Sequence, residues 1–362
     1  DLHSFPTRRS SDLRTCLGLT CSIKWSGAYL LAAVGILTVV WDMMALRRVR
    51  ARKWFLDGIL HRSVLDFLHL VPVAFVVYVL GWWSWFIHDR AFYRNWAATQ
   101  RDRGELVRAW LPDSLNSLFE YHRSMYNFHT HLKEPHPYMS KPIEWLVQWR
   151  PTSFYWPDER ELAGARCGTG KCVQAITSIG NIPVWWSAII GLVFCVLVLA
   201  IRNRDWRVWV SLIGYVGLYL PWFIYQNRTI FNFYTVAFVP FVVLALTLWL
   251  GTISGLIEPV PGSRLAVKED AALASGSIGE GRPYPRGFMA RLLGFGGRPM
   301  RRGLPAEWTG VPVWRTRVEG LCVLTVVVVI ATVFAVLWWP IWTGQMVSFD
   351  FWHWHMLLPS WV

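Results

Sequence analysis

The segment GLCVLTVVVVIATVFAVLWWPIW, residues 320–342, decides the fold class because it contains no charged side chain. About 20 consecutive apolar residues form a helix that crosses the roughly 30 Å hydrocarbon core of a membrane. Further charge-free runs of this size cover residues 67–87, 182–201, 208–227 and 229–257, and a shorter run over 25–41 continues past Asp42 to residue 46. We therefore predict an all-α polytopic membrane protein with about six transmembrane helices.

The composition agrees with a membrane protein and excludes several other classes. Hydrophobic residues make up 54% of the chain and charged residues only 16%, whereas about a quarter of a soluble domain is charged. The chain is too apolar for a disordered protein and has too few cysteines for a disulfide scaffold. A formal net charge of +13 would suit a nucleic-acid binder. The basic residues are instead concentrated in a few connections, so we expect no nucleic-acid partner.

The positions of these basic residues predict the orientation of the spans. Lys and Arg gather in residues 46–62, 202–207 and 258–318, and alternating spans place these three segments on one side. The positive-inside rule assigns that side to the cytoplasm. The loop 88–181 and the tail 343–362 then lie outside a multi-pass cell-membrane protein. Residues 258–318 are rich in Gly, Pro, Ser and Arg and are predicted to be a flexible cytoplasmic linker.

The first residues do not fit this organisation. Residues 1–13, DLHSFPTRRSSDL, are polar and look like a translated adapter or another cloning scar, so we exclude them from the fold prediction. The apolar residues 15–23 are half a span long and end before Lys24. We expect residues 14–87 to hold this partial helix and two spans, in a chain that is truncated at its N-terminus.

One part of the predicted external loop has the periodicity of a helix. Asp113 or Ser114 is a suitable cap. Apolar and aromatic residues and two histidines then recur on one face, at Leu115, Leu118, Phe119, His122, Met125, Tyr126 and His129. We expect an amphipathic helix along the outer membrane surface. The rest of the loop keeps many Trp, His and Pro residues, as functional loops of this length often do.

Two of the six cysteines lie in this loop. Cys167 and Cys172 belong to the segment CGTGKC, and an oxidising compartment outside the cytoplasm favours a disulfide between them over free thiols or a zinc site. The other four cysteines fall in apolar runs, where the simplest interpretation is buried packing.

Two basic residues near the outer boundary are candidates for binding. Arg228 stands alone between two long apolar runs, and Lys24 precedes the first full span. An arginine at this depth can hold a lipid-linked phosphate through paired hydrogen bonds. The alternative is an interfacial anchor whose charged end reaches the headgroups, and for Lys24 the pattern favours the anchor.

The histidines of the loop suggest a metal site only weakly. His122, His129, His131 and His136 lack the carboxylate partners and ligand spacing of zinc sites, so we expect no metal. Contacts to a sugar or peptide, or plain helix packing, are the better interpretations. The chain also lacks a P-loop and a dinucleotide-binding glycine motif, so we expect no nucleotide cofactor.

Several ordered motifs resemble one family. These are TCSIKW (residues 20–25), HPYMSKPIEWLVQWRP (136–151), IGNIPVWW (179–186) and YQNRTIFNFY (225–234). They look like the protein O-mannosyltransferases, membrane glycosyltransferases of the GT-C class that use polyprenyl-phosphate mannose as donor. The basic linker and the Trp-rich tail are similar to the actinobacterial members.

The resemblance implies a reaction and a division of roles. Mannose would pass with inversion from the lipid phosphate to Ser or Thr hydroxyls of exported proteins, near the export translocon in some cases and without a cofactor. Arg228 would bind the lipid phosphate with help from Lys24. A group of loop residues would shape the substrate and acceptor site: His122, His136, Tyr138, Ser140, Lys141 and Trp145.

The resemblance also implies what this chain lacks. The family's catalytic carboxylate pair belongs to an earlier external loop, and no residue here matches it. The chain would be the C-terminal portion of the enzyme and inactive alone. Alternatives are a related GT-C transferase with a lipid or glycan acceptor, a transporter, or a non-catalytic membrane subunit. The charge-free spans and the absence of repeats disfavour the transporter.

Overall fold

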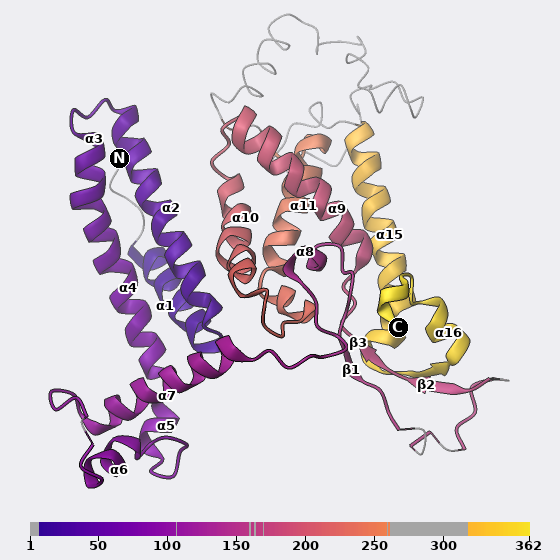
Figure 1. Ribbon diagram of the computed structural model, residues 1–362. Helices are drawn as coiled ribbons and strands as arrows, with labels where there is room; N and C mark the ends of the chain where they lie inside the picture. The colour runs from indigo at the N-terminus through magenta and orange to yellow at the C-terminus, as the bar shows by residue number, and fades with distance from the viewer. Residues whose placement is uncertain are drawn as a thin grey trace, which may run out of the picture. The chain divides into compact units, whose positions relative to one another are not determined.

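The computed structural model is mainly helical, and it divides into two units (Figure 1). The first contains residues 1–135 and 216–229, and the second contains residues 136–215 and 230–362. Within these ranges the structure describes residues 7–105, 107–158, 161–162, 164–168, 170–258, 260 and 318–362.

The first unit is built from helices. In chain order they are α1 (Thr7–Ile23), α2 (Ser26–Arg48), α3 (Trp54–Leu56), the π-helix η1 (Asp57–Arg62), α4 (Ser63–Leu80), α5 (Trp83–Ile87), α6 (Trp96–Asp102), α7 (Asp113–His131) and the 3₁₀-helix η4 (Leu220–Tyr225). Helix α1 packs against both α2 and α4. Gly18 permits this approach, because a Cβ at that position would overlap the Ala74 carbonyl and the Val77 side chain.

Two boundaries in the first unit differ from the prediction. Helix α1 includes Thr15–Ile23 as expected but continues back to Thr7, into the polar segment that we excluded. The second span begins at Trp54 and not near residue 67. Polar Asp57, His61 and Arg62 are accommodated in η1, which continues directly into α4. A prediction based on charge-free runs starts this span too late.

The predicted external helix is present as α7, but the prediction that Asp113 or Ser114 caps it was wrong. Pro112 occupies the cap position, and Asp113 is already helical. The Asp113 carboxylate does not cap the helix. It accepts two hydrogen bonds from the Arg101 guanidinium, at 2.9 and 2.6 Å. Such a paired geometry satisfies both carboxylate oxygens.

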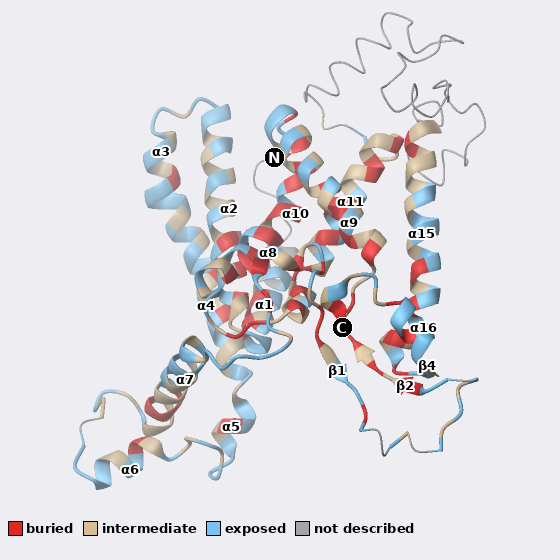
Figure 2. Ribbon diagram, turned by 45° about the vertical axis from the view of Figure 1, so that its right-hand side comes forward, coloured by how far each residue is buried: buried red, intermediate tan, exposed pale blue. Residues whose placement is uncertain are grey.

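The second unit combines helices with two short sheets. In chain order it contains α8 (Pro142–Trp145), β1 (Ser153–Tyr155), β2 (Cys172–Gln174), β3 (Ile176–Thr177), α9 (Ile182–Phe194), η2 (Cys195–Arg202), α10 (Val208–Gly214), η5 (Asn232–Ala237), α11 (Val239–Ser254), α15 (Val318–Thr343), β4 (Met346–Ser348), α16 (Phe349–Trp354) and η7 (Pro359–Trp361). Strand β1 pairs antiparallel with β3, and β2 with β4. Helix α11 contacts α9, α10 and α15, and buried residues gather along these helices (Figure 2).

The start of α9 links the loop to the last span. The Asn181 side chain caps α9 by accepting a hydrogen bond from the Val184 N–H at 3.2 Å, and it donates to the Ala331 carbonyl of α15 at 2.8 Å. The Trp342 indole donates to the Ile179 carbonyl at 2.6 Å. An apolar core adjoins these bonds. Its buried members are Val173, Ala175, Ile179, Ile182, Phe334, Trp338, Ile341, Trp352 and Trp361.

The predicted span over residues 229–257 is a shorter helix. Among the described residues, five helices are long and apolar enough to cross a membrane: Ser26–Arg48, Trp54–Leu80, Ile182–Arg202, Val208–Tyr225 and Val318–Thr343. Helix α11 has 16 residues, about 24 Å at 1.5 Å per residue. The residues before it are held by the loop, because the Ile230 carbonyl accepts from the Ser140 N–H. Part of this apolar segment, including Ile230 and Phe238, is buried in protein.

The predicted linker cannot be compared with the structure. Apart from residues 258, 260 and 318, the segment 258–318 lies outside the described residues.

Gln148 connects the ordered motifs of the second unit. Its side chain is 1% exposed. The amide oxygen accepts hydrogen bonds from the Asn232 side chain at 2.9 Å and from the Gly180 N–H at 3.2 Å. The amide nitrogen donates to the Trp145 carbonyl at 3.0 Å, and the Gln148 carbonyl accepts from the Trp361 indole at 2.8 Å. One buried residue therefore joins the loop, two further motifs and the tail.

We predict that Gln148→Leu destabilises this unit. The change leaves the Asn232 amide and the Gly180 N–H without their acceptor, and each unsatisfied buried group costs about 1–3 kcal/mol. Thermal unfolding in detergent should show a lowered midpoint. Gln174→Leu is the control, because the half-buried Gln174 side chain makes a single hydrogen bond within the described part of the chain, to the Gly344 carbonyl. Equal effects of the two substitutions would contradict the connecting role of Gln148.

Candidate functional site

The two predicted cations lie in the first unit and share one aromatic ring. Lys24 occupies the corner between α1 and α2, and Arg228 follows the turn after η4. The Lys24 Nζ lies 5.0 Å from the centroid of the Trp222 ring, and the Arg228 Cζ lies 5.9 Å from it. Trp222 is buried. Residues 204 positions apart in sequence thus form a positive pair on an indole, an arrangement that cation–π attraction supports.

The two positive charges of the pair act on each other. Burial lowers the pKa of Lys24 to about 8, with a further contribution from the positive charge of Arg228. This shift occurs although part of Lys24 remains accessible to solvent. The Arg228 Nε is buried and has no hydrogen-bond partner among the described residues. A phosphate oxygen would satisfy this donor and relieve the repulsion.

A chain of tyrosines lies next to the cations. The hydroxyls of Tyr29 on α2 and Tyr225 on η4 are 2.5 Å apart, and the Tyr126 hydroxyl of α7 also hydrogen-bonds to Tyr225. The Tyr225 carbonyl accepts the backbone N–H of Arg228 at 3.2 Å. Tyr29, Tyr225 and Trp222 were not among the predicted site residues. Only the helical periodicity of α7 marked Tyr126 in advance.

His122 is committed to internal contacts. Its Nδ1 donates to the Leu118 carbonyl at 2.7 Å, and its Nε2 accepts from the Tyr78 hydroxyl. The Trp25 indole donates to the same Tyr78 oxygen at 3.0 Å and stacks on the imidazole with centroids 5.3 Å apart. Burial lowers the pKa of His122, in agreement with a neutral ring. These contacts support the packing interpretation and leave neither ring nitrogen free for a substrate.

The remaining predicted loop residues belong to the second unit, and two of them shape the loop. The Trp145 side chain is fully buried, and its indole donates to the Ser140 hydroxyl at 2.9 Å. Pro142 begins α8, and the Glu144 carboxylate accepts the Lys141 N–H at 2.8 Å as a helix-capping contact. Ser140 and Trp145 therefore fix the conformation of the segment.

His136, Tyr138 and Lys141 are the accessible members of the group. The His136 Nδ1 accepts the Tyr138 N–H at 3.1 Å, and its ring meets Phe231 edge-to-face with centroids 5.0 Å apart. Arg150 stands over the Tyr138 ring, with its Cζ 5.8 Å from the centroid. These side chains can contact a substrate directly. Gln148, which bonds to the Trp145 carbonyl, and its partner Asn232 were missed because polar residues in apolar motifs gave no sign of being paired.

The structure joins Cys167 and Cys172 by a disulfide, with Cα atoms 5.3 Å apart. Cys172 is the first residue of β2, so the bond closes the turn that leads into this strand. Among the other cysteines, Cys21 and Cys195 are buried as expected. Cys16 is exposed and Cys322 only half-buried, which corrects the prediction for these two. Cys16 lies on a different face of α1 from the buried neighbours Leu17 and Gly18.

No metal-binding group of three or more His, Cys, Asp or Glu side chains occurs within the described ranges. His131 directs its Nδ1 to the Asn127 carbonyl of its own helix at 2.7 Å. The described histidines of the loop therefore make separate contacts.

We predict that Cys167 and Cys172 resist maleimide labelling in intact membranes until a reductant is added. Closing so short a loop contributes about 2 kcal/mol in the chain-entropy account, so the double Ser variant should unfold at a slightly lower temperature. Exposed Cys16 provides the reference for a reactive thiol. Labelling of the pair without reductant would disprove the bond.

Comparison with known proteins identifies the region that carries these motifs. Residues 114–258 match the C-terminal four TMM region of protein-O-mannosyltransferase. The chain is similar to polyprenol-phosphate-mannose–protein mannosyltransferases, with 35% identity over 254 residues to that of Mycobacterium tuberculosis, 33% over 243 to that of Mycolicibacterium smegmatis and 29% over 252 to that of Corynebacterium glutamicum.

The matches cover 68%, 66% and 68% of this chain but only 47%, 46% and 47% of the respective relatives. The chain therefore spans about half the length of the curated relatives that it matches. No solved structure gives a significant match. Through these regions, the chain belongs to the protein O-mannosyltransferase family.

Proposed function

We propose that this chain is the C-terminal part of an enzyme that transfers mannose from polyprenyl-phosphate mannose to Ser or Thr hydroxyls of exported proteins, with inversion. The observation that carries the proposal is the pair of Lys24 and Arg228 on the ring of Trp222. Two cations with a buried, unpaired guanidinium donor suit the phosphate of a lipid-linked sugar. The relatives named for this activity supply the sugar and the acceptor class.

An apolar groove beside the cations suits the lipid chain of the donor. It lies between α2 and α4 and has two adjoining parts, both of which include Ala28, Leu31 and Val71. One part ends at Trp25, the residue after Lys24, and the other extends along α2 to Val40. From residue 25 to residue 40 a helix rises roughly 22 Å. The groove thus offers a path for a prenyl chain whose phosphate is at Lys24.

The charge on the leaving phosphate defines what this chain contributes to the reaction. As the mannose bond breaks, negative charge grows on the phosphate, and preorganised cations stabilise it. The carboxylate that removes the proton from the acceptor hydroxyl would come from outside this chain. Lys24, Arg228, His136, Tyr138 and Lys141 would face the outside, where acceptors emerging from the export translocon meet the loop, while residues 258–318 would be cytoplasmic.

The decisive variant is Arg228→Ala in the full-length protein. Transfer from polyprenyl-phosphate mannose to an acceptor peptide should fall by about 100-fold or more, the loss typical of removing one donor to a developing anion. Arg123→Ala is the control, because Arg123 is exposed on α7 and its one ion pair in the part of the chain that the structure describes is with Glu120, at 3.4 Å. Wild-type turnover of the Arg228 variant would reduce this residue to a membrane anchor.

The pH dependence of donor binding tests Lys24. A pKa of about 8 means that Lys24 is charged below this pH and loses its proton above it. The KM for the lipid donor should therefore rise between about pH 8 and pH 9.5. Lys24→Arg should abolish this rise, because arginine stays protonated throughout the range. A rise of equal size in that variant would exclude Lys24 as its origin.

A further inference from the structure

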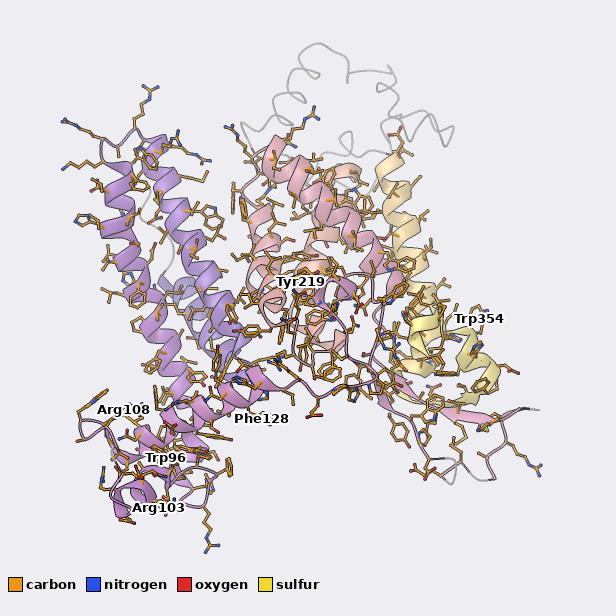
Figure 3. All side chains as sticks on the ribbon, viewed as in Figure 1. Trp96, Arg103, Arg108, Phe128, Tyr219 and Trp354 are labelled. Carbon is orange, nitrogen blue, oxygen red and sulfur yellow. A yellow bond between two sulfur atoms is a disulfide. The ribbon has the colours of Figure 1, made fainter. Side chains whose placement is uncertain are left out.

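One face of α7 extends from the aromatic cluster to the cations. His122, Tyr126 and His129 are spaced four and three residues apart, so their side chains point to the same side of the helix. His122 fixes the rotation of α7 through Tyr78 and Trp25. Figure 3 labels Phe128, the residue before His129, toward the end of this helix.

Tyr126 lies one helical turn after His122 and brings this part of α7 next to the segment that carries Arg228. Its hydroxyl bonds to Tyr225, whose carbonyl holds the Arg228 backbone. One turn further stands His129. Three residues after it, the Leu132 carbonyl accepts the backbone N–H of Thr229, the neighbour of Arg228, at 3.0 Å, so the end of α7 lies beside the turn that carries Arg228. No hydrogen bond to the His129 ring occurs among the described residues. The ring is exposed and meets only Phe128 edge-to-face, at 5.3 Å.

We propose that His129 is a third ligand of the phosphate, and that its ring takes up one proton from solvent when the anion binds. This inference rests on the proposed function, because it requires a phosphate between Lys24 and Arg228. It adds a group from α7 to a site otherwise formed by the α1–α2 corner and the turn after η4.

The charges around His129 give the direction of the coupling. Although His129 is largely exposed, partial desolvation of its ring lowers its pKa, and the charges of Arg228 and Lys24 lower it further. The other titratable groups of this cluster are Tyr29, Tyr126 and Tyr225. His129 is therefore mainly neutral in the empty site. A bound phosphate offsets both cations, raises the pKa of His129 and allows the imidazolium to donate to a phosphate oxygen.

The coupling is stronger for the product than for the donor. The donor is a phosphodiester with one negative charge, whereas the released polyprenyl phosphate is a monoester whose second pKa is about 6. Departure of the sugar leaves the bonding electron pair on the phosphate oxygen, so the anion gains one charge. A group that interacts more strongly with this state than with the donor lowers the barrier to transfer.

The experiment measures binding of a short-chain polyprenyl phosphate to the full-length protein in detergent. Calorimetry at pH 7 in two buffers of different ionisation enthalpy gives the number of protons taken up. We expect His129→Gln to remove most of one proton from this number and to weaken binding about tenfold. His129→Arg should restore the affinity without the proton uptake. His131→Gln, with a ring that contacts its own helix, should match the wild type.

Two outcomes separate this inference from the proposed function. If His129→Gln binds with wild-type affinity and proton uptake, while Arg228→Ala abolishes transfer, the role of His129 is excluded and the phosphate site stands. If Arg228→Ala keeps wild-type turnover, the site itself is disproved. Should His129→Gln unfold, the proton count of His129→Arg decides, because arginine cannot titrate near pH 7. Wild-type uptake in that variant would overturn the proposal.

Discussion

The proximity of Lys24 and Arg228 is the feature of the first unit on which the proposed phosphate site depends. Both cations lie within 6 Å of one buried indole, Trp222, although each would be more stable alone in water. Three separate parts of the chain hold them there: the α1–α2 corner, the turn after η4, and the tyrosines that connect this turn to α2 and α7. Perturbed titratable groups cluster at functional sites, and this is the basis on which we propose an anion site here.

The second unit depends on a different device, a buried amide that satisfies several partners at once. Gln148 serves the loop, Asn232 and Gly180 through its side chain, and its carbonyl binds the Trp361 indole. Rigid support of this kind allows accessible side chains such as Tyr138 and Lys141 to be presented in a defined geometry. We thus propose that the cations of the first unit bind an anionic lipid. We propose that the loop of the second unit, held by neutral hydrogen bonds, contacts a polypeptide.

Much of the architecture could be predicted because charged residues are largely excluded from membrane spans, so their positions indicate where the spans lie. Charge-free runs located the spans, and periodicity located α7. The method failed where apolar residues are buried by protein, as before α11, where Ile230 and Asn232 contact the loop. It also failed where polar residues belong to a helix, as in η1. Hydropathy averages do not distinguish an apolar residue that faces lipid from one that is buried in protein. They also do not distinguish a charged residue within a helix from one in a connection between helices.

The site was predictable only in part, and for a related reason. Arg228 stood out because an isolated charge between apolar runs is costly. Tyr29, Trp222 and Gln148 did not, because an aromatic or amide residue in an apolar run is common and its partner lies far away in sequence. For His122 the sequence left a substrate contact and helix packing open, and its contacts favour packing, because both ring nitrogens bond within the protein.

The most direct test of the phosphate site is a structure of the full-length protein with bound polyprenyl phosphate. We predict phosphate oxygens within about 3 Å of the Arg228 guanidinium and the Lys24 ammonium, the distance of charge-assisted hydrogen bonds, with the prenyl chain along α2 and α4. A phosphate bound elsewhere, with Lys24 and Arg228 still together on Trp222, would contradict the account.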